Sequence, residues 1–206
     1  MAAGGALTHR LFLAFDLDEA CREALTRLVD RLTAHLESAG IDPRRVKWVV
    51  RENLHVTVRF LGAVPGPQVG RLRAVLAPAF SSPTFVLRFD RLGAFPAAGR
   101  PRVIWVGDST GTRGADRARR ELDQRLAGLG LEPEPRPFEA HVTLGRFRDP
   151  PHAVAARAIR ELRFAPLSPV SVSDLTLYES RLSSCAPAYA VLQRSPLGRP
   201  SPVGRV

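Results

Sequence analysis

The chain has 206 residues, 45% of them hydrophobic, which is enough to bury a core in one large domain or in two small lobes that share a cleft. Its 30 Lys and Arg residues outnumber 20 Asp and Glu, and the net charge of +10 favours a polyanionic partner: nucleic acid first, a membrane surface as the weaker alternative.

The two cysteines, Cys21 and Cys185, lack CxxC spacing, which argues against a disulfide framework or a structural zinc site and indicates free thiols. No apolar run has the layout of a signal peptide or the length to span a bilayer, so we expect a cytoplasmic protein without membrane contact.

In the first half of the chain, short apolar runs alternate with amphipathic segments. We expect residues 1–9 to form a flexible tail. The run LFLAFD predicts a buried strand, and Asp18 suits the N-cap of a helix whose leucines recur at helical spacing. In chain order, the predicted elements are a strand at 11–16, a helix at 19–37, strands at 46–50 and 54–61, and a helix at 67–80.

The second half repeats this mixture and ends in a segment rich in Pro, Gly, Ser and Arg. Its predicted elements are strands at 85–92 and 103–106, a helix at 115–129, a strand at 138–147, a helix at 152–162, and strands at 170–178 and 189–194. Strand pairs between helices favour an α+β fold with antiparallel sheets over a doubly wound parallel sheet. We therefore expect one bilobal domain at 10–194 and a disordered tail at 195–206. Neither GxGxxG nor GxxxxGK[ST] is present, so nucleotide binding of those types is not supported.

One short pattern occurs twice, as LHVTVRF in the first half and as AHVTLGRF in the second. Because side chains alternate across a strand, His55 should share a face with Thr57, and His141 should share a face with Thr143. The residues predicted to point the opposite way are Val56, Val58, Phe60, Val142 and Leu144. A single histidine in a strand is usually a structural residue. Two copies, in a pseudo-symmetric fold, would instead place two imidazoles across one cleft.

Two His-Thr pairs suit phosphoryl chemistry better than metal binding. No carboxylate or thiolate completes a metal site, so we expect neither a metal nor another cofactor. A neutral imidazole can take a proton from water while an imidazolium gives one to a leaving oxygen, since both states coexist near the usual histidine pKa of about 6.5. The threonine hydroxyls can donate hydrogen bonds to phosphate oxygens as negative charge develops on them. Which histidine would be the acid is left open by this reasoning.

With their flanks, the two motifs resemble the 2H phosphoesterase superfamily, and more closely its bacterial and archaeal RNA 2′,3′-cyclic phosphodiesterases, also called 2′-5′ RNA ligases. The resembling segments are RLFLAFDLDEACREAL, VKWVVRENLHVTVRFLG, RPFEAHVTLGRF and LYESRLSSCAPAYAVL, so nearly the whole chain is covered. Each HxTx alone is unspecific, whereas the ordered set is specific. Two departures are Gly145, where the family often has alanine, and Cys185-Ala186-Pro187, where a glycine usually precedes the proline.

The resemblance implies a fold, a reaction and residue roles. The fold would be two pseudo-symmetric lobes of antiparallel sheet, with helices outside and a central cationic cleft. His55 would be the proton donor, His141 the proton acceptor, and Thr57 and Thr143 would bind the phosphate. The reaction would hydrolyse a terminal 2′,3′-cyclic phosphate of RNA to a 2′-phosphomonoester, with joining through a 2′-5′ bond as the reverse direction. We expect a monomer acting on RNA.

Residues near the motifs are secondary candidates. Arg59 and Arg146 each lie within a few residues of a motif, and Arg146 is a candidate phosphate contact, with a solvated strand end as the alternative. Tyr178 and Phe12 are candidates to stack on a base, although aromatic residues in strands more often belong to the core. We expect Trp48 to pack behind the first motif.

Two other functions stay open at this point. One is a binding module that holds RNA or a nucleotide without turnover. Against it, a pure binder has no use for two titrating imidazoles. The other is a phosphodiesterase for a small cyclic nucleotide or an ADP-ribose derivative. The sequence leaves the physiological RNA and its base preference undetermined.

Overall fold

A single antiparallel sheet dominates the computed structural model, which describes residues 7–109, 113–151, 154–181 and 187–198. Its strands follow the order β10-β9-β1-β3-β7-β6-β5. A further strand, β2, pairs with residues 145–147 at the end of β7. The strands are β1 (Thr8–Phe15), β2 (Val46–Trp48), β3 (Val56–Pro65), β5 (Arg91–Phe95), β6 (Val103–Gly107), β7 (His141–Phe147), β9 (Asp174–Arg181) and β10 (Ala188–Pro196). A separate ladder pairs β4 (Phe85–Leu87) with β8 (Val170–Val172). The predicted α+β class with antiparallel sheets is confirmed.

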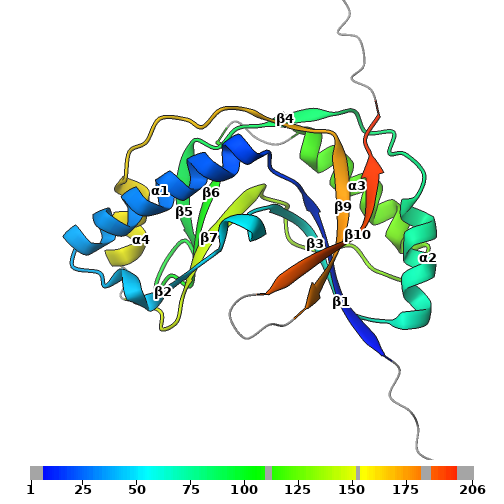
Figure 1. Ribbon diagram of the computed structural model, residues 1–206, viewed down its shortest axis with the longest axis horizontal. Helices are drawn as coiled ribbons and strands as arrows, with labels where there is room; N and C mark the ends of the chain where they lie inside the picture. Colours follow the sequence, from blue (N-terminus) through cyan, green and yellow to red (C-terminus); the bar gives the residue numbers. More distant parts are fainter. Residues whose placement is uncertain (1–6, 110–112, 152–153, 182–186, 199–206) are drawn as a thin grey trace, which may run out of the picture.

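The helices divide between the two halves of this sheet. Figure 1 shows α1 and α4 on the side of β2, β5, β6 and β7, and α2 and α3 on the side of β1, β3, β9 and β10. The bounds are α1 (Glu19–Ser38), α2 (Gly66–Leu76), α3 (Arg113–Ala127) and α4 (Val154–Glu161), with short 3-10 turns at Pro43–Arg45 and Arg51–Asn53. The buried side chains of both halves belong to one contiguous cluster. The arrangement is the pseudo-symmetric one implied by the resemblance.

Helix α1 shows why the local sequence adopts its structure. The Asp18 carboxylate accepts a hydrogen bond from the backbone N–H of Cys21 (2.7 Å), which caps the first turn. Leu25, Leu28, Leu32 and Leu36 are all at most 3% exposed. This apolar stripe has the helical period, so the helix and its cap lie where the sequence predicts them.

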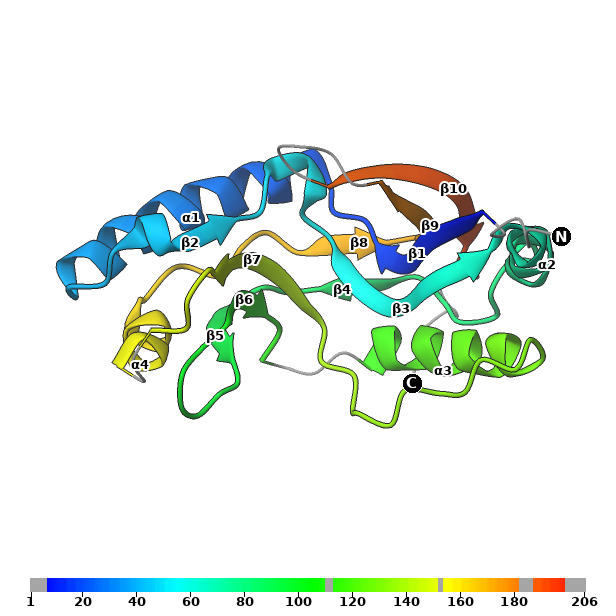
Figure 2. The same ribbon diagram turned by 90° about the horizontal axis from the view of Figure 1, so that it is seen from below.

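The two halves of the sheet meet through one residue pair. In the ladder between β3 and β7, only Val56 and Val142 pair, and both side chains are fully buried. In antiparallel register, the residues on either side of this pair are the histidines and threonines of the two motifs. His55 therefore lies beside Thr143, and Thr57 lies beside His141. Figure 2 shows β3 and β7 diverging on either side of this contact.

Each motif is followed by an extra residue that changes the register of its strand. In β3, Thr57 faces Ala14 and Arg59 faces Leu13, so Val58 is the extra residue. In β7, Thr143 faces Trp105 and Gly145 faces Ile104, so Leu144 is the extra residue. Two successive buried residues follow each threonine, as expected for a β-bulge. The bulges turn the next side chains, Phe60 and Arg146, onto the face of the histidines.

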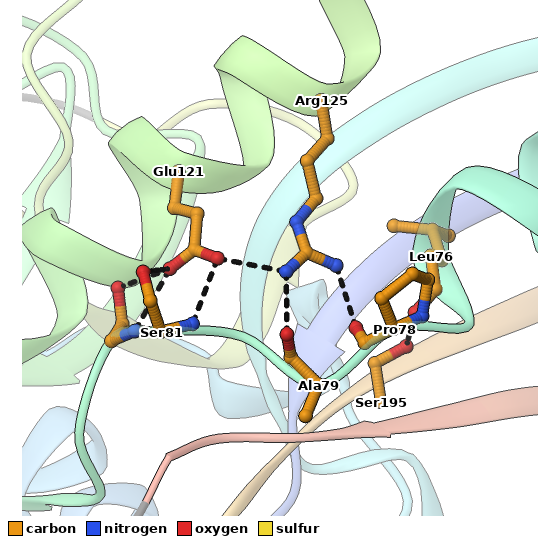
Figure 3. Close-up of polar contacts among 8 residues, drawn as sticks. Leu76, Pro78, Ala79, Ser81, Glu121, Arg125 and Ser195 are labelled. Atoms are coloured by element: carbon orange, nitrogen blue, oxygen red, sulfur yellow. Dashed lines mark hydrogen bonds and ion pairs between the residues drawn. The ribbon is translucent and has the colours of Figure 1, made fainter.

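A half-buried carboxylate on α3 holds the segment that follows α2 (Figure 3). Glu121 accepts hydrogen bonds from the backbone N–H groups and hydroxyls of Ser81 and Ser82, and it pairs with Arg125 at 2.8 Å. Burial opposes ionisation, but these hydrogen bonds outweigh it and hold the pKa of Glu121 at about 2. Arg125 also donates to the carbonyls of Pro78 and Ala79. The same region receives the end of β10, where the Ser195 hydroxyl donates to the Leu76 carbonyl (2.7 Å).

Several predicted boundaries are wrong. Strand β1 begins at Thr8, inside the segment expected to be a flexible tail. Ser195 and Leu197 are buried, so the predicted C-terminal tail begins too early, while residues 199–206 lie outside the described chain. The predicted strands at 85–92 and 170–178 are each two strands, because β4 and β8 pair with each other and β5 and β9 join the main sheet. Phe60, expected to point opposite to His55, is 66% exposed and contacts Phe12 on the His55 face, because of the bulge at Val58.

The contacts of Gly145 predict a stability effect. A Cβ at this position would lie 2.6 Å from Val46 Cγ1 and 2.8 Å from the Trp48 ring. Gly145→Ala should therefore lower the free energy of unfolding by about 1–3 kcal/mol through overpacking. Gly70→Ala is the matched control: this exposed helical glycine has nothing within 4 Å, and the change should stabilise by about 0.5–1 kcal/mol. Urea unfolding measures both, and an unaltered stability for Gly145→Ala would contradict the close packing.

Candidate active site

The two histidines are oriented by equivalent backbone hydrogen bonds. His55 Nδ1 donates to the carbonyl of Asn53, and His141 Nδ1 donates to the carbonyl of Glu139, each at 2.7 Å. A carbonyl only accepts, so in both neutral rings the proton lies on Nδ1 and the Nε2 lone pair is available. The sequence reasoning found both rings but missed these carbonyls. Their common position, two residues before each histidine, was a signal present in the repeat.

The Nε2 atoms of the two rings differ in their surroundings. The Thr57 hydroxyl lies 2.9 Å from His55 Nε2 and donates to it when the ring is neutral. Within the part of the chain that the structure describes, neither His141 Nε2 nor the Thr143 hydroxyl has a hydrogen-bond partner. Both are half-buried and open to a ligand. The two motifs therefore come together as a pair of imidazoles and a pair of hydroxyls.

Burial keeps both imidazoles neutral in the free protein. Loss of hydration lowers the pKa of His55 to about 4, although the Asn53 carbonyl and the charge of Asp16 act in the opposite direction. Desolvation also lowers the pKa of His141, which the Glu139 carbonyl partly opposes. Positive charge on His141 lowers the pKa of His55 further, so the rings are close enough to repel each other when both are charged.

Aromatic rings surround both histidines. The centroid of His55 lies 5.0 Å from that of Phe12 and 5.5 Å from that of Tyr189, and Tyr178 is 6.5 Å away. The centroid of His141 lies 5.1 Å from that of Phe95, which meets it edge-on, and 6.0 Å from that of Trp105. These rings exclude water from each imidazole, which is the physical cause of the lowered pKa values. Of them, the sequence reasoning considered only Phe12 and Tyr178.

A pocket of about 510 Å³ opens beside His55. Tyr178, Tyr189, Asn53 and Arg194 are among the residues that line it. The Tyr178 hydroxyl donates to Asp16, and the Asn53 amide donates to the carbonyl of Pro187 (2.6 Å). This second contact ties the segment before β10 to the turn that carries the first motif; residues 182–186, including Cys185, lie outside the described chain.

The structure places the two arginines near the motifs in different environments, Arg59 buried and Arg146 exposed. Arg59 points away from the histidines and is buried, where it pairs with Asp123 of α3 and donates to the Glu132 carbonyl. Arg146 is exposed on the face of His141. Burial is the main cause of the low pKa of His141, and the charge of Arg146 adds to it. Burial raises the pKa of Tyr189, in the other half of the sheet, and the charge of Arg146 opposes this rise. Arg146 therefore lies near both sides of the site.

Trp48 is half-buried and packs against the core. Its ring lies against Gly145 of the second motif, and not behind the first motif as predicted.

Among the residues that the structure describes, no group of three or more His, Cys, Asp or Glu side chains is placed to hold a metal ion. None of the described helices is both long enough and apolar enough to cross a membrane.

Comparisons with known proteins agree on one family. The family model described as "LigT like Phosphoesterase" matches residues 15–105 and again residues 106–189, one match for each motif. The RNA 2′,3′-cyclic phosphodiesterase of Aeropyrum pernix is 34% identical over 80% of this chain and 94% of its own length. That of Methanothermobacter thermautotrophicus is 32% identical over 89% of this chain and 96% of its own length. A crystal structure of E. coli LigT complexed with 3′-AMP superposes with a TM-score of 0.72 at 26% identity, over 94% of this chain and all of that one.

The surroundings of the histidines predict their titration. In the free protein, His55 should titrate near pH 4 and His141 below 6.5, because burial disfavours both imidazolium ions. Inorganic phosphate should raise both values, since a bound anion stabilises positive charge. NMR of the imidazole protons measures this, with His55→Gln and His141→Gln to assign the signals. A pKa at or above 6.5 for either ring without phosphate would refute the burial argument.

Proposed function

The chain belongs to the LigT-like phosphoesterases, and we propose that it hydrolyses the 2′,3′-cyclic phosphate at the end of an RNA to a 2′-phosphomonoester. The observation that carries the proposal is the pairing of Val56 with Val142, which places the two His-Val-Thr motifs in register beside each other. A cyclic phosphate between them would meet an imidazole on either side. The names of the curated relatives support RNA as the substrate.

The proposed reaction is an in-line displacement at phosphorus. His141 Nε2 takes a proton from the attacking water, as its free lone pair allows. His55 Nε2, once protonated, gives its proton to the departing 3′-oxygen. The water oxygen forms the new P–O bond, the P–O3′ bond breaks, and the phosphate stays on the 2′-oxygen. With its low pKa, protonated His55 is a strong acid for the leaving oxygen, and the negative phosphate favours this protonation when substrate binds.

The remaining site residues would stabilise the phosphate. The hydroxyls of Thr57 and Thr143 lie on the face of the histidines and can donate to the non-bridging oxygens as charge builds there. Arg146 can supply a positive charge to the same group. Because both motifs come from one chain, the site needs no partner subunit, and we propose that the protein acts as a monomer. No cofactor enters this reaction.

The histidines carry the main prediction. His55→Ala and His141→Ala should each lower kcat/KM for a 2′,3′-cyclic nucleotide by roughly 10² to 10⁴, and the double variant should be little worse, because both act in one transition state. The unaltered protein should show a bell-shaped pH dependence of kcat/KM. Its maximum lies midway between the two apparent pKa values and therefore below pH 6.5, since both are lowered in the free protein. Each variant should lose one limb of the bell.

Two further variants separate binding from proton transfer. Thr57→Val and Thr143→Val should cost about one to three powers of ten in kcat while both pH limbs remain, since they remove a donor to the phosphate and leave the histidines. Thermal unfolding confirms that each variant is folded. A folded His55→Ala protein with full activity would overturn the proposed function.

Removal of metal ions tests the proposed mechanism without any substitution. We expect hydrolysis to continue at an unaltered rate in excess EDTA, because the proposed chemistry uses imidazoles as acid and base. The assay compares initial rates on a cyclic mononucleotide before and after dialysis against chelator. Activity that is lost on dialysis and restored by added zinc or magnesium would contradict this mechanism.

A further inference from the structure

Two successive residues of β3 reverse the usual partition between core and surface. Arg59 is buried at 7% exposure, whereas Phe60 is 66% exposed. Regular alternation along β3 would bury position 60, and the extra residue, Val58, prevents this. The buried guanidinium then needs a charged partner, which Asp123 of α3 provides. The bulge therefore replaces an apolar core contact with a buried ion pair, and it presents an aromatic ring on the face of His55.

The ring of Phe60 is the exposed end of an aromatic row that crosses three strands. Phe60 pairs with Phe12 of β1, which pairs in turn with Tyr178 of β9. The ring centroids lie 6.0 Å apart in the first pair and 5.2 Å apart in the second, where the rings are stacked. Phe12 is only 3% exposed, so it leaves a nucleobase no free ring face. The ring of Phe60 is mostly free and can stack on a base.

A cation lies beyond this row on the same face of the sheet. Arg10 precedes Phe12 by two residues on β1, so both side chains point to the face of His55. Burial raises the pKa of Tyr189 on β10, and the charge of Arg10 opposes this rise, so the guanidinium lies near the aromatic rings. Across residues 7–109, 113–151, 154–181 and 187–198, the exposed Arg10 side chain has no hydrogen bond or ion pair within the protein. It is therefore free to bind a phosphate.

These groups follow one another along the two strands. On β3, Phe60 comes after Thr57 with increasing distance from His55, and Arg10 of β1 lies further still, opposite Ala63. The face therefore presents a hydroxyl for the reacting phosphate, then an aromatic ring, then a positive charge. A single RNA strand that runs away from the reacting phosphate offers bases and phosphates to match.

The pocket beside His55 is a different surface, because neither Phe60 nor Arg10 lines it. Its volume of about 510 Å³ is within the range of about 300–1,000 Å³ that is typical of small-molecule sites. Tyr178 and Tyr189 are among the residues that line it. The pocket can hold one nucleoside, the one that carries the cyclic phosphate, so the ring and the cation outside it face the next part of the strand.

We propose that Phe60 and Arg10 form a second nucleotide subsite, in which Phe60 stacks on the base that precedes the terminal nucleotide and Arg10 binds the phosphodiester between the two. This inference rests on the proposed function and narrows its substrate class: an RNA chain of at least two nucleotides is preferred over a cyclic mononucleotide. Every base has a π face, so the subsite distinguishes chain length and not sequence.

The test compares three substrates. They are a 2′,3′-cyclic mononucleotide, a dinucleotide that ends in the same cyclic nucleotide, and that dinucleotide with an abasic first position. Phe60→Leu keeps an apolar side chain but loses the ring face, Phe60→Trp keeps a ring, and Arg10→Gln removes the charge. The matched controls are Val86→Ala, at an exposed apolar residue of β4, and Arg117→Gln, at an exposed residue of α3. The readout is kcat/KM for hydrolysis, and thermal unfolding confirms that each variant is folded.

We expect the unaltered protein to prefer the dinucleotide over the mononucleotide by about 10-fold to 10²-fold in kcat/KM. Phe60→Leu should lower kcat/KM for the dinucleotide about tenfold and leave the abasic dinucleotide and the mononucleotide unaltered, whereas Phe60→Trp should retain the preference. Arg10→Gln should lower kcat/KM for both dinucleotides about tenfold and reduce the slope of log kcat/KM against log salt by about 0.7, for one lost phosphate contact. The control variants should match the unaltered protein on all three substrates.

The outcomes that contradict the inference are distinct from those that contradict the proposed function. A folded Phe60→Leu protein that keeps the full dinucleotide preference overturns the inference, as does an unaltered protein that hydrolyses the dinucleotide and its abasic form equally well. If Phe60→Leu slows the mononucleotide as much as the dinucleotide, the ring supports the terminal nucleoside, and the inference is wrong while the proposed function stands. If the unaltered protein hydrolyses none of the three substrates, the proposed function fails, and the inference fails with it.

Discussion

The geometry of the candidate active site depends on one antiparallel contact, the pairing of Val56 with Val142 between β3 and β7. Because side chains alternate along a strand, burying these two valines forces the histidine and threonine on either side of each to the opposite face. A shift of one residue in either strand would send that motif's imidazole into the core. The contact is only one pair long, so the strands diverge beyond it, and a substrate can lie over the junction.

The two bulges give both motifs the same backbone irregularity, but the side chains that follow the bulges differ in chemistry. Val58 and Leu144 each insert one residue directly after a threonine, so both strands turn the third residue after the threonine onto the site face. On β3 this residue is Phe60, beside the ring of Phe12, and on β7 it is Arg146. At this position, one half of the sheet therefore presents an aromatic ring and the other presents a positive charge.

The two histidines are neutral in the free protein, although the chain as a whole is strongly positive. The chain carries a net charge of +10, yet its two central imidazoles are held neutral by burial among aromatic rings. Positive charge on His55 is disfavoured by desolvation, by Arg22 and by His141. In the mechanism that we propose, a phosphate anion bound between the rings would offset these effects, which would link substrate binding to protonation of His55. In this proposal, the net positive charge would attract the anion, and an imidazolium would form only once the anion is bound.

The sequence by itself determined the elements and residues whose signals are local. The cap and leucine stripe of α1, the two His-Val-Thr motifs and the burial of Val56, Val142 and Leu144 follow from short-range periodicity. Only the tertiary structure decided which strands are neighbours, and with it the outward turn of Phe60, the burial of Arg59 against Asp123 and the separation of β4 from β5. It also decided that the end of β10 is buried and that Asn53 and Glu139 orient the histidines. The physical reason is that periodicity records which side of a strand is apolar, whereas bulges and partners are set by hydrogen bonds to residues far away in the sequence.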